Sequence, residues 1–484
     1  MNILFVTSEV HPLIKTGGLA DVSRSLPRAL HQLGLDIRIL LPGYPAVLKQ
    51  LPKARVCCQI TSATADSPPA RLLQDLLPGT KVPVLVLECA ALYDRPGSPY
   101  QDASGKDWTD NALRFGFLCQ VGAWLCGPHS ALDWRPDIVH CNDWQSALIP
   151  ALLHHQEKPA TRAVLTIHNL AFQGNFEPQW VTRLGLPMES FHMHGLEFYG
   201  QLSFLKSGIN YADRITTVSK RYAAEIQTPA FGCGMEGLLQ HRSDDLTGIV
   251  NGIDEEWNPA LDPAIAASFD ATHLAAKARN KRALQRECGL TRNPAIMLIG
   301  MVTRLTHQKG LDVLLACMEA LTQYPVQLVV LGSGEAAIEQ RLQHWAHLHP
   351  DRVSVTLAFD EALSHRIMAG CDLFLMPSRF EPCGLSQMYA MAYGAPPLVH
   401  RTGGLADTVT NCTPKTLADK TATGFSFDEL TPEALQTTLL RAIACFEEKK
   451  GWRALQRIGM RRDFSWDKAA AQYLAVYRQL VAEA

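Results

Sequence analysis

Two cations on one short loop in the second half of the chain could hold an anionic ligand. Arg304 and Lys309 are separated by Leu-Thr-His-Gln and follow an apolar run at 295–302 that we expect to be a strand. An arginine offers a planar fork of donors and a lysine a point charge, so together they could clamp a diphosphate. The segment 332–335, Gly-Ser-Gly-Glu, ends the next predicted strand and could line the same nucleotide. The alternative is a solvated basic loop.

A carboxylate stands on a turn shaped by proline and glycine. Glu381 follows the predicted strand 372–377 and lies in the segment 377–386, Pro-Ser-Arg-Phe-Glu-Pro-Cys-Gly-Leu-Ser. It could accept hydrogen bonds from sugar hydroxyls, while the backbone N–H groups after it could bind phosphate where the next helix starts. The alternative is that Glu381 caps that helix. In the first case Glu381→Ala should abolish turnover and leave thermal stability nearly intact; in the second, stability should collapse.

The first half has its own candidate for anion binding in the Lys-Thr-Gly-Gly segment 15–18. Glycines permit a close approach of the backbone, the helix that follows would present unpaired N–H groups, and Lys15 adds positive charge. The alternative is a glycine-rich turn, because the segment matches neither a Walker A loop nor the Gly-x-Gly-x-x-Gly fingerprint. The hexapeptide Thr-Gly-Gly-Leu-Ala-Asp at 16–21 recurs at 402–407, again directly after a basic residue, which predicts similar chemistry for both copies.

Polar residues also follow two further predicted strands of the first half. Asn-Asp-Trp-Gln at 142–145 follows the strand 137–141, and an indole beside amide and carboxyl groups suits the face and the hydroxyls of a sugar. The alternative is that Asn142 or Asp143 caps the next helix. His168 ends another predicted strand, where a histidine could serve chemistry or act as a structural hydrogen-bonding group.

All these segments follow short apolar runs, and such runs alternate with amphipathic stretches along most of the chain. That alternation predicts doubly wound parallel sheets, in which ligands bind beyond the carboxyl ends of the strands. The other expected strands are 3–8, 36–41, 82–88, 162–168, 214–219, 248–251, 326–332, 353–359 and 397–400. We expect a first domain over 1–245, a second over 246–465 with a cleft between them, and a final helix in 466–484. Residues 62–70 are expected to form a surface loop.

Composition narrows the class of protein. The chain has 484 residues, 47% hydrophobic and 19% charged, and its 45 Lys and Arg against 47 Asp and Glu leave a net charge of −2. These values predict no nucleic-acid partner and no membrane association, since no apolar run reaches the ~18–20 residues that span a bilayer. Residues 1–9 are typical of a first strand and not of a signal peptide. Its 13 cysteines include no Cys-x-x-Cys pair, which favours reduced thiols in a cytoplasmic protein.

Together, the motifs resemble those of the bacterial glycogen synthase and plant starch synthase family, over essentially the whole chain. The first half contributes Lys-Thr-Gly-Gly-Leu at 15–19, Asn-Asp-Trp-Gln at 142–145, Thr-Ile-His-Asn at 166–169, Val-Asn-Gly-Ile-Asp at 250–254 and Trp-Asn-Pro at 257–259. The second half contributes 304–310, 377–385 and 401–407. Each motif alone is unspecific, whereas all of them in this order indicate the family.

The resemblance implies a GT-B glycosyltransferase, an α/β protein with two Rossmann-like, doubly wound domains facing a central cleft and a C-terminal helix that crosses back to the first domain. It implies transfer of glucose from ADP-glucose to the non-reducing end of an α-1,4-glucan, such as glycogen or a maltooligosaccharide, with retention of configuration and release of ADP. It implies no cofactor and no metal, and the sequence contains no Asp-x-Asp pair. Whether the chain is a monomer or a homo-oligomer stays open.

The resemblance also implies roles for individual residues. The residues implied in catalysis are His168, Glu381, Arg304 and Lys309. Those implied in donor binding are Lys15, Gly18, Asp143, Asn251, Phe359, Cys383, Gly384, Leu385, Ser386, Tyr389, Gly403 and Gly404. Those implied in acceptor binding are Glu9, Trp144 and Gln145.

Some positions depart from what the resemblance leads us to expect. Tyr389 stands where many transferases of this fold carry a second glutamate that contacts ribose, and Phe359 where relatives commonly have a tyrosine against adenine. Gln145 replaces a histidine of some bacterial relatives. The alternatives are a UDP-glucose-dependent transferase of the same fold, a glucan phosphorylase using pyridoxal phosphate, and a non-catalytic protein that binds glucan or nucleotide. The phosphorylases are far longer, and no good candidate for their cofactor lysine is visible.

Overall fold

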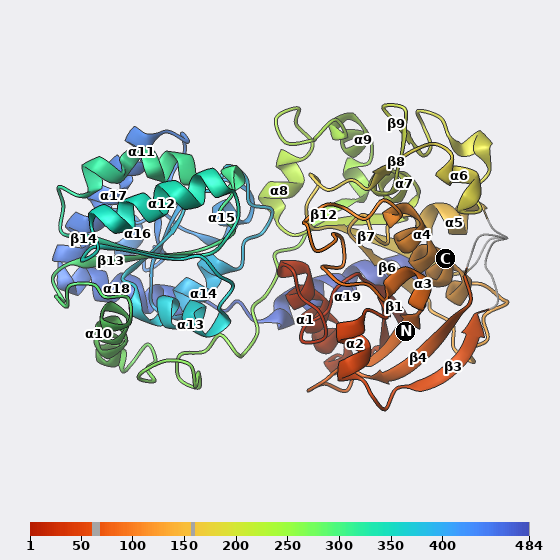
Figure 1. The fold of residues 1–484 in the computed structure, drawn as a ribbon, viewed down its shortest axis with the longest axis horizontal. Coiled ribbons are helices and arrows are strands. Elements are labelled where there is room, and N and C mark those ends of the chain that lie inside the picture. Colours follow the sequence, from red (N-terminus) through yellow and green to blue (C-terminus); the bar gives the residue numbers. More distant parts are fainter. Residues whose placement is uncertain (61–67, 156–159, 484) are drawn as a thin grey trace. The chain divides into compact units, whose positions relative to one another are not determined.

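The chain folds into two compact units. The computed structural model describes residues 1–60, 68–155 and 160–483. Unit 1 consists of Met1–Gly252 and Trp466–Ala484, and unit 2 of Ile253–Ser465 (Figure 1).

The boundary between the units falls later in the sequence than expected. Strand β12, Leu246–Gly248, pairs with β11, Arg214–Thr217, in the sheet of unit 1, so residues 246–252 belong to the first unit and not to the second. This strand replaces the one expected at 248–251. Within the loop expected at 62–70, residues 62–67 lie outside the described residues, and β4 already begins at Ala70.

Unit 1 is built on a nine-stranded sheet in the order β12-β11-β7-β6-β1-β2-β5-β4-β3. From β12 to β5 the neighbouring strands are parallel, and β5, β4 and β3 are antiparallel. The strands not yet given are β1 Asn2–Val6, β2 Asp36–Pro42, β3 Arg55–Ile60, β4 Ala70–Leu76, β5 Pro83–Glu88, β6 Ile138–Asn142 and β7 Arg162–Ile167. Because β2 and β6 flank β1 on opposite sides, the winding reverses at β1, which is where open α/β sheets bind ligands.

Helices and a small second sheet complete unit 1. Its helices are α1 Gly18–Gln32, α2 Pro45–Gln50, α3 Ala90–Tyr93, α4 Asn111–Cys126, α5 Ile149–His155, α6 Trp180–Arg183, α7 Phe204–Tyr211, α8 Lys220–Glu225, α9 Glu236–His241 and α19 Trp466–Ala482. An antiparallel sheet joins β8 Asn175–Phe176, β10 Gln201–Ser203 and β9 Glu197–Phe198. Single 3-10 turns occur at Met188–Ser190 and Ser243–Asp245. Helix α4 is apolar on all sides and accordingly lies buried.

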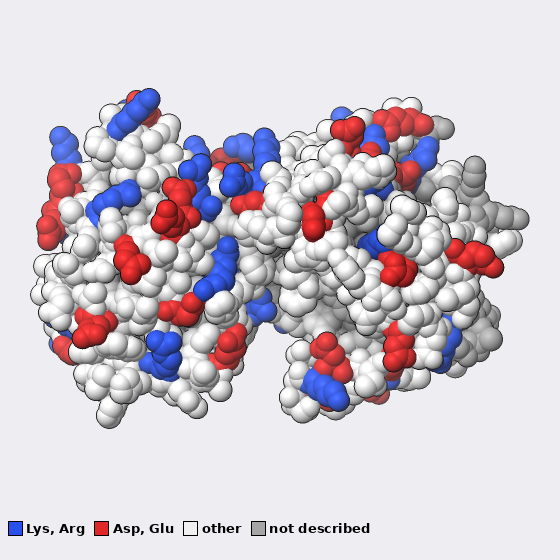
Figure 2. All heavy atoms as spheres, turned by 90° about the horizontal axis from the view of Figure 1, so that it is seen from above, with Lys and Arg blue, Asp and Glu red and all other residues white. Residues whose placement is uncertain are grey.

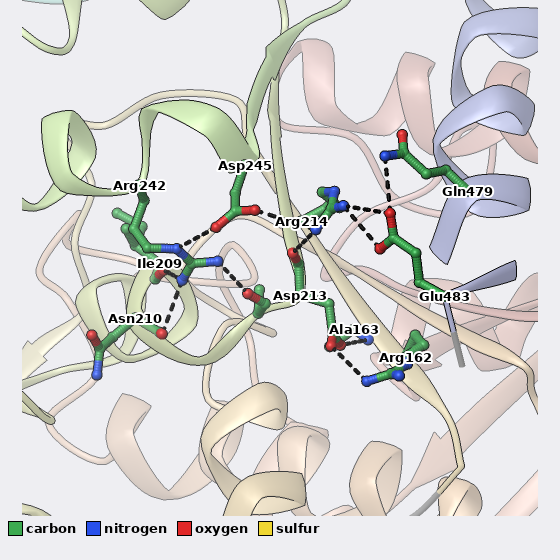
Figure 3. Close-up of polar contacts among 11 residues, drawn as sticks. Arg162, Ala163, Ile209, Asn210, Asp213, Arg214, Arg242, Asp245, Gln479 and Glu483 are labelled. Atoms are coloured by element: carbon green, nitrogen blue, oxygen red, sulfur yellow. Dashed lines mark hydrogen bonds and ion pairs between the residues drawn. The ribbon is translucent and has the colours of Figure 1, made fainter. Parts of the chain in front are cut away.

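The last helix, α19, packs on α1 and is held to unit 1 by polar contacts at two points. Midway along it, the Tyr477 hydroxyl is hydrogen-bonded to Nδ1 of His140 at 2.7 Å. Burial lowers the pKa of His140 to about 3, so its ring is neutral there. Just after the helix, Glu483 accepts hydrogen bonds of 2.9 and 3.1 Å from Nη2 of Arg214, which also pairs with Asp245 (Figure 3).

Unit 2 is built on a six-stranded, all-parallel sheet in the order β15-β14-β13-β16-β17-β18. Its strands are β13 Met297–Val302, β14 Val326–Leu331, β15 Val353–Thr356, β16 Leu373–Met376, β17 Pro397–His400 and β18 Phe425–Phe427. Its helices are α10 Lys277–Glu287, α11 Leu311–Leu321, α12 Ala336–Leu348, α13 Glu361–Gly370, α14 Ser386–Ala392, α15 Gly403–Thr408, α16 Pro414–Ala418, α17 Pro432–Glu447 and α18 Lys449–Met460, with 3-10 turns at Leu274–Ala276 and His307–Lys309. The winding reverses between β13 and β16.

Both sheets are doubly wound, as the alternation of apolar runs predicted, and the two missed strands β3 and β4 have a common explanation. Strand β3 contains two exposed positions at its start and a bulge, and β4 contains the polar residues Arg71, Gln74 and Asp75, so neither has the continuous apolar sequence of a buried strand. Such an antiparallel edge needs only one covered face. The strand expected at 353–359 ends at Thr356, and Phe359 lies beyond it, before α13.

The surface agrees with the near-zero net charge. Figure 2 shows Lys and Arg interspersed with Asp and Glu over the face that it displays. Within the described residues, no helix combines the length and the apolar character that crossing a membrane requires.

Candidate functional site

Unit 2 contains a pocket at the carboxyl ends of β13 and β16, where the winding of its sheet reverses. The residues that line it are Met301, Val302, Thr303, Lys309, Leu375, Met376, Ser378, Glu381, Gly384, Leu385 and Ser386. The structure therefore brings together two of the predicted catalytic residues and three of the predicted donor-binding residues in one hollow. A pocket at this point of a parallel sheet is the position at which open α/β folds bind nucleotides and related ligands.

An ion pair crosses this pocket. Nζ of Lys309 lies 2.6 Å from Oε2 of Glu381, and the side chains are only 14% and 10% exposed. The hydroxyl of Ser378 donates to the same carboxylate oxygen at 3.1 Å. Among the described residues, no side chain caps the N-terminus of α14, so Glu381 does not act as the helix cap considered above. The carboxylate and the ammonium are both within reach of a ligand in the pocket.

The pair of glycines in the second hexapeptide supports the turn that carries Glu381. Gly403 has a φ of +43°, and a Cβ on it would lie 2.0 Å from the carbonyl oxygen of Glu381. The N–H of Gly404 donates to that same carbonyl at 3.0 Å, and a Cβ on Gly404 would lie 2.0 Å from the carbonyl oxygen of Cys383. These glycines permit backbone-to-backbone packing, and Cys383 is buried beneath it.

Arg304 stands apart from this pocket in the described structure. Its side chain is exposed and outside the lining, and Nη2 donates to Oε1 of Gln308 at 3.4 Å. The neighbouring segment 332–335 packs on the same loop, since the N–H of Leu305 donates to the carbonyl of Ser333 at 2.9 Å. The structure therefore shows a supported loop with an exposed guanidinium, and not a preformed two-cation clamp.

Phe359 and Tyr389, the two aromatic residues that depart from the expected pattern, have opposite environments. Phe359 is 81% exposed, which leaves its ring open to stack against a ligand. The ring of Tyr389 is covered by Trp257, with centroids 3.8 Å apart and planes 10° apart. The other face of Trp257 covers His365 at 3.9 Å. In the sequence Trp257 stands out only as part of the motif at 257–259, because its place in a three-ring stack depends on contacts distant in sequence.

In unit 1, the Lys-Thr-Gly-Gly loop is tied to the end of β1. Both carboxylate oxygens of Glu9 accept hydrogen bonds from Thr16, from its N–H at 2.5 Å and its hydroxyl at 2.6 Å, and Tyr100 also donates to Glu9. Lys15 is paired with Asp21 at 2.8 Å. Glu9 therefore shapes the loop in this structure, a role that differs from the acceptor contact predicted for it.

The glycines of that loop leave room for a ligand. Gly17 is the N-cap residue of α1, and a Cβ placed on it would meet no described atom within 4 Å. Gly18 begins the helix, and within the described residues no side chain caps its N–H groups. The first N–H groups of a helix carry partial positive charge, so this end suits an anion, and anion binding there stays a prediction.

A second cluster in unit 1 joins the ends of β6 and β7. Asp143, with a φ of 54°, accepts hydrogen bonds through Oδ1 from the N–H groups of His168 at 2.7 Å and Asn169 at 3.2 Å. Burial raises the pKa of Asp143 to about 7, despite these hydrogen bonds. Asn142 holds the ring of His168, with Oδ1 lying 3.0 Å from Nε2.

The protonation state of His168 follows from the same contacts. The amide nitrogen of Asn142 is already used in donating to the carbonyls of Val6 and His140, so its oxygen must accept a hydrogen bond from Nε2 of His168. Burial lowers the pKa of His168 to about 3, so the ring is neutral at ordinary pH. Nδ1 then carries a lone pair. Asn142, which the sequence analysis treated as a sugar ligand or cap, instead sets this tautomer.

Trp144 and Gln145, predicted to contact the acceptor, are directed inward. The ring of Trp144 packs edge-on against Phe115 with centroids 4.9 Å apart, and Gly174 approaches it so closely that a Cβ there would overlap it. Gln145 is buried, and its Oε1 has no hydrogen-bond partner within the described residues; Asn251, also buried, has an Oδ1 in the same condition. The ring of Trp144 therefore packs into the interior of unit 1. The side-chain amides of Gln145 and Asn251 each have an oxygen that accepts no hydrogen bond from the described residues.

Known proteins with similar sequences place this chain in a family. The profile described as "Starch synthase catalytic domain" matches residues 2–241, and "Glycosyl transferases group 1" matches residues 291–454. A glycogen synthase of Nitrosospira multiformis is 52% identical over 99% of this chain and 97% of its own length. One of Nitrosomonas eutropha is 53% identical over 99% of this chain and 96% of its own. The chain belongs to the glycogen synthase family.

Solved structures agree with this assignment. The catalytic domain of starch synthase IV from Arabidopsis thaliana, bound to ADP and acarbose, matches with a TM-score of 0.89 at 30% identity, covering 99% of each chain. Sucrose-phosphate synthase from Thermosynechococcus elongatus, at 19% identity and a TM-score of 0.61, shares the fold. The predictions of family, of the GT-B fold and of a glycosyltransferase of glycogen synthesis are thus confirmed.

The ion pair in the pocket predicts that removing the Glu381 carboxylate lowers the stability of the fold, whereas the sequence predicted nearly intact stability for a Glu381 that binds sugar. Glu381→Leu leaves the ammonium of Lys309 largely buried and without its partner, so we expect the free energy of unfolding to fall by on the order of 3 kcal/mol. The double variant Lys309→Met with Glu381→Leu should recover most of that loss. Denaturant unfolding of the parent and both variants measures this. A single variant as stable as the parent would contradict the prediction.

The raised pKa of Asp143 predicts a pH-dependent stability. The unfolded group ionises near its usual value, whereas the folded group keeps its proton up to about pH 7, so this residue destabilises the fold progressively as pH rises between those values. Asp143→Asn keeps an accepting Oδ1 and tolerates the positive φ. The difference in Tm between variant and parent should therefore grow from about pH 5 to about pH 8. As a control, Asp102→Asn, at an exposed carboxylate whose hydrogen bonds lower the pKa, should show no such growth.

Proposed function

We propose that this chain transfers glucose from ADP-glucose to the non-reducing end of an α-1,4-glucan, with retention of the α configuration, release of ADP and no metal ion. The observation that carries the proposal is the Lys309–Glu381 pair in a pocket at the winding reversal of unit 2. In support, the starch synthase IV domain that matches this chain was solved with ADP and acarbose, a nucleotide and an oligosaccharide analogue.

The donor diphosphate is the largest negative charge in the proposed reaction, and its negative charge increases as the glycosidic bond breaks. In our proposal Lys309 and Arg304 bind it, and Arg304 turns in from its exposed position. Positioned cations in a site that excludes water stabilise such a developing charge far more than they would in solution. Lys15 and the first N–H groups of α1, at Gly18, are proposed as a further anion-binding group within unit 1. In our proposal these groups neutralise the diphosphate without a metal ion.

Glu381 then becomes the partner of the sugar. When the diphosphate engages Lys309, the carboxylate loses part of its ionic partner and can accept hydrogen bonds from glucose hydroxyls. Gly384, Leu385 and Ser386 line the same pocket, and we propose that their backbone N–H groups contact the donor. Phe359 is proposed to stack on the base. Tyr389 is proposed to contribute only through its edge, because its face is covered.

His168 is proposed to lie beside the glucosyl carbon as a neutral ring. A cation there would oppose the positive charge that builds on the sugar, whereas a neutral imidazole and the main-chain carbonyl present lone pairs to it. The contacts that hold this arrangement are the Asn142 amide and the Asp143 carboxylate. Asp143 is further proposed to bind a glucose hydroxyl through the oxygen that does not accept from the backbone.

Because the ring of His168 does not titrate near neutral pH, its replacement should change the rate without changing the shape of the pH profile. We expect His168→Gln to lower kcat by roughly 10²-fold or more, the scale of losing one positioned group in a transition state. Initial rates from about pH 5 to about pH 9 for parent and variant measure this. Loss of an acidic limb in the variant would show that the ring carries a proton in the parent, against the proposal.

The donor and the chemistry are tested by nucleotide release with glycogen present. ADP-glucose and UDP-glucose are compared with and without EDTA, and the elongated product is digested with an enzyme specific for α-1,4 linkages. We expect glycogen-dependent ADP release that EDTA does not reduce, and product that is fully digested. Preference for UDP-glucose would overturn the donor assignment, loss of activity in EDTA the metal independence, and binding without release from either donor the catalytic role itself.

A further inference from the structure

Arg379 lies two residues before Glu381, on the same turn after β16, but it faces a different partner. Its guanidinium holds the carboxylate of Asp312 in a two-pronged contact, with Nη1 to Oδ1 at 2.8 Å and Nη2 to Oδ2 at 2.7 Å. Nη1 also donates to the carbonyl of His307 at 3.1 Å, and the backbone N–H of Arg379 donates to the carbonyl of Gln308 at 2.9 Å. One residue thus makes four hydrogen bonds to the segment 307–312, which contains the end of the loop after β13 and the first turn of α11.

These contacts join the same two loops that meet in the pocket. Asp312 lies in the first turn of α11, directly after the 3-10 turn that ends at Lys309. The side chain of Gln308 adds a further link by donating to the carbonyl of Phe380 at 3.3 Å. The Arg379–Asp312 contact therefore runs beside the Lys309–Glu381 pair and spans the same gap between the carboxyl ends of β13 and β16.

The geometry and charge of this contact indicate that Arg379 holds two loops at a fixed distance, and does not serve as a cation that binds a ligand. Burial tends to raise the pKa of Asp312, but the hydrogen bonds and charge of Arg379 outweigh it and leave that pKa below its usual value. Asp312 is therefore ionised at neutral pH and compensates the charge of Arg379. A planar guanidinium bound at both prongs fixes distance and orientation together, which a lysine ammonium cannot do.

We propose that Arg379 is a positioning residue: through its fork on Asp312 it holds the Glu381 turn and the Lys309 loop at the spacing that a sugar-nucleotide diphosphate requires. The proposal rests on the proposed function for its substrate, but the contact itself does not. The side chains are 28% and 38% exposed, so the contact contributes little to folding. Its effect lies in geometry, since misplacing a binding group by about 1 Å can cost about 10²-fold in rate.

The chain offers a matched control in the same unit. Arg366 on α13 makes an equally short fork on Glu287 of α10, with Nη2 to Oε1 at 2.8 Å and Nε to Oε2 at 3.0 Å, and with exposures of 29% and 40%. Neither residue lines the pocket, and the pair links two helices, not the two loops. Arg379→Lys and Arg366→Lys both keep the charge and remove a fork on a carboxylate, so the comparison reports the effect of losing the contacts between the two loops.

The first measurement is made on the full chain with ADP-glucose and glycogen. We expect Arg379→Lys to lower kcat/KM for the sugar nucleotide by roughly 10- to 100-fold, while Arg366→Lys stays within about twofold of the parent and both show similar Tm values. Asp312→Asn, which leaves a one-pronged acceptor, should act in the same direction as Arg379→Lys. Should Arg379→Lys fail to fold, Asp312→Asn carries the test. Equal kinetics for the Arg379, Asp312 and Arg366 variants would overturn the proposal.

The second measurement asks whether Arg379 acts through Lys309. In a Lys309→Met background, Arg379→Lys should add less than a threefold further loss, because the group that it positions is already gone; full additivity would overturn the positioning role. Calorimetric binding of ADP to the same variants separates this proposal from the function. If the parent transfers no glucose but Arg379→Lys, unlike Arg366→Lys, still weakens ADP binding, the proposed function fails and the positioning role stands.

Discussion

In each unit of this protein, two neighbouring parallel strands mark the point at which the winding of the sheet reverses. After one of these strands the chain continues toward one edge of the sheet, and after the other it continues toward the opposite edge. The pairs are β1 with β6, and β13 with β16. Because the helices that follow go to opposite faces, the loops at this point are free to converge on the same small volume. Glu9, Asp143, His168, Lys309 and Glu381 each follow one of these strands or an immediate neighbour. The order of the strands in each sheet thus decides which side chains can meet in a site.

The two units accommodate partly buried ionisable side chains in different ways. Unit 2 compensates charge with charge, in the Lys309–Glu381 pair and the Arg379–Asp312 fork. Unit 1 suppresses charge: the ring of His168 is neutral, and burial raises the pKa of Asp143 to about 7. Unit 2, which is proposed to bind the diphosphate, therefore has in the Lys309–Glu381 pair an ionic contact that a ligand can exchange, whereas unit 1 offers neutral groups with lone pairs.

The repeated hexapeptide shows how one sequence can serve two physical purposes. In the first copy Gly17 is the N-cap of α1, and nothing described lies near the position of a Cβ, so the space is open to a ligand. In the second copy Gly403 and Gly404 are pressed against the backbone of Glu381 and Cys383. Identical letters predicted similar chemistry for both. The neighbours that decide the difference come from residues 381–383, which no local pattern connects to residues 402–407.

The sequence by itself determined the two doubly wound sheets, because buried parallel strands must be apolar on both faces and their alternation with helices is visible in one dimension. It also determined which residues follow the strands, and so placed Lys309, Glu381, Asp143 and His168 near ligand-binding edges. Only the tertiary structure decided what those side chains contact: that Glu9 holds Thr16, that Trp144 packs inward, and that Asn142 sets the tautomer of His168. The positions of strands and helices along the chain follow from hydrophobic periodicity, whereas strand order and side-chain partners depend on contacts between residues far apart in the chain.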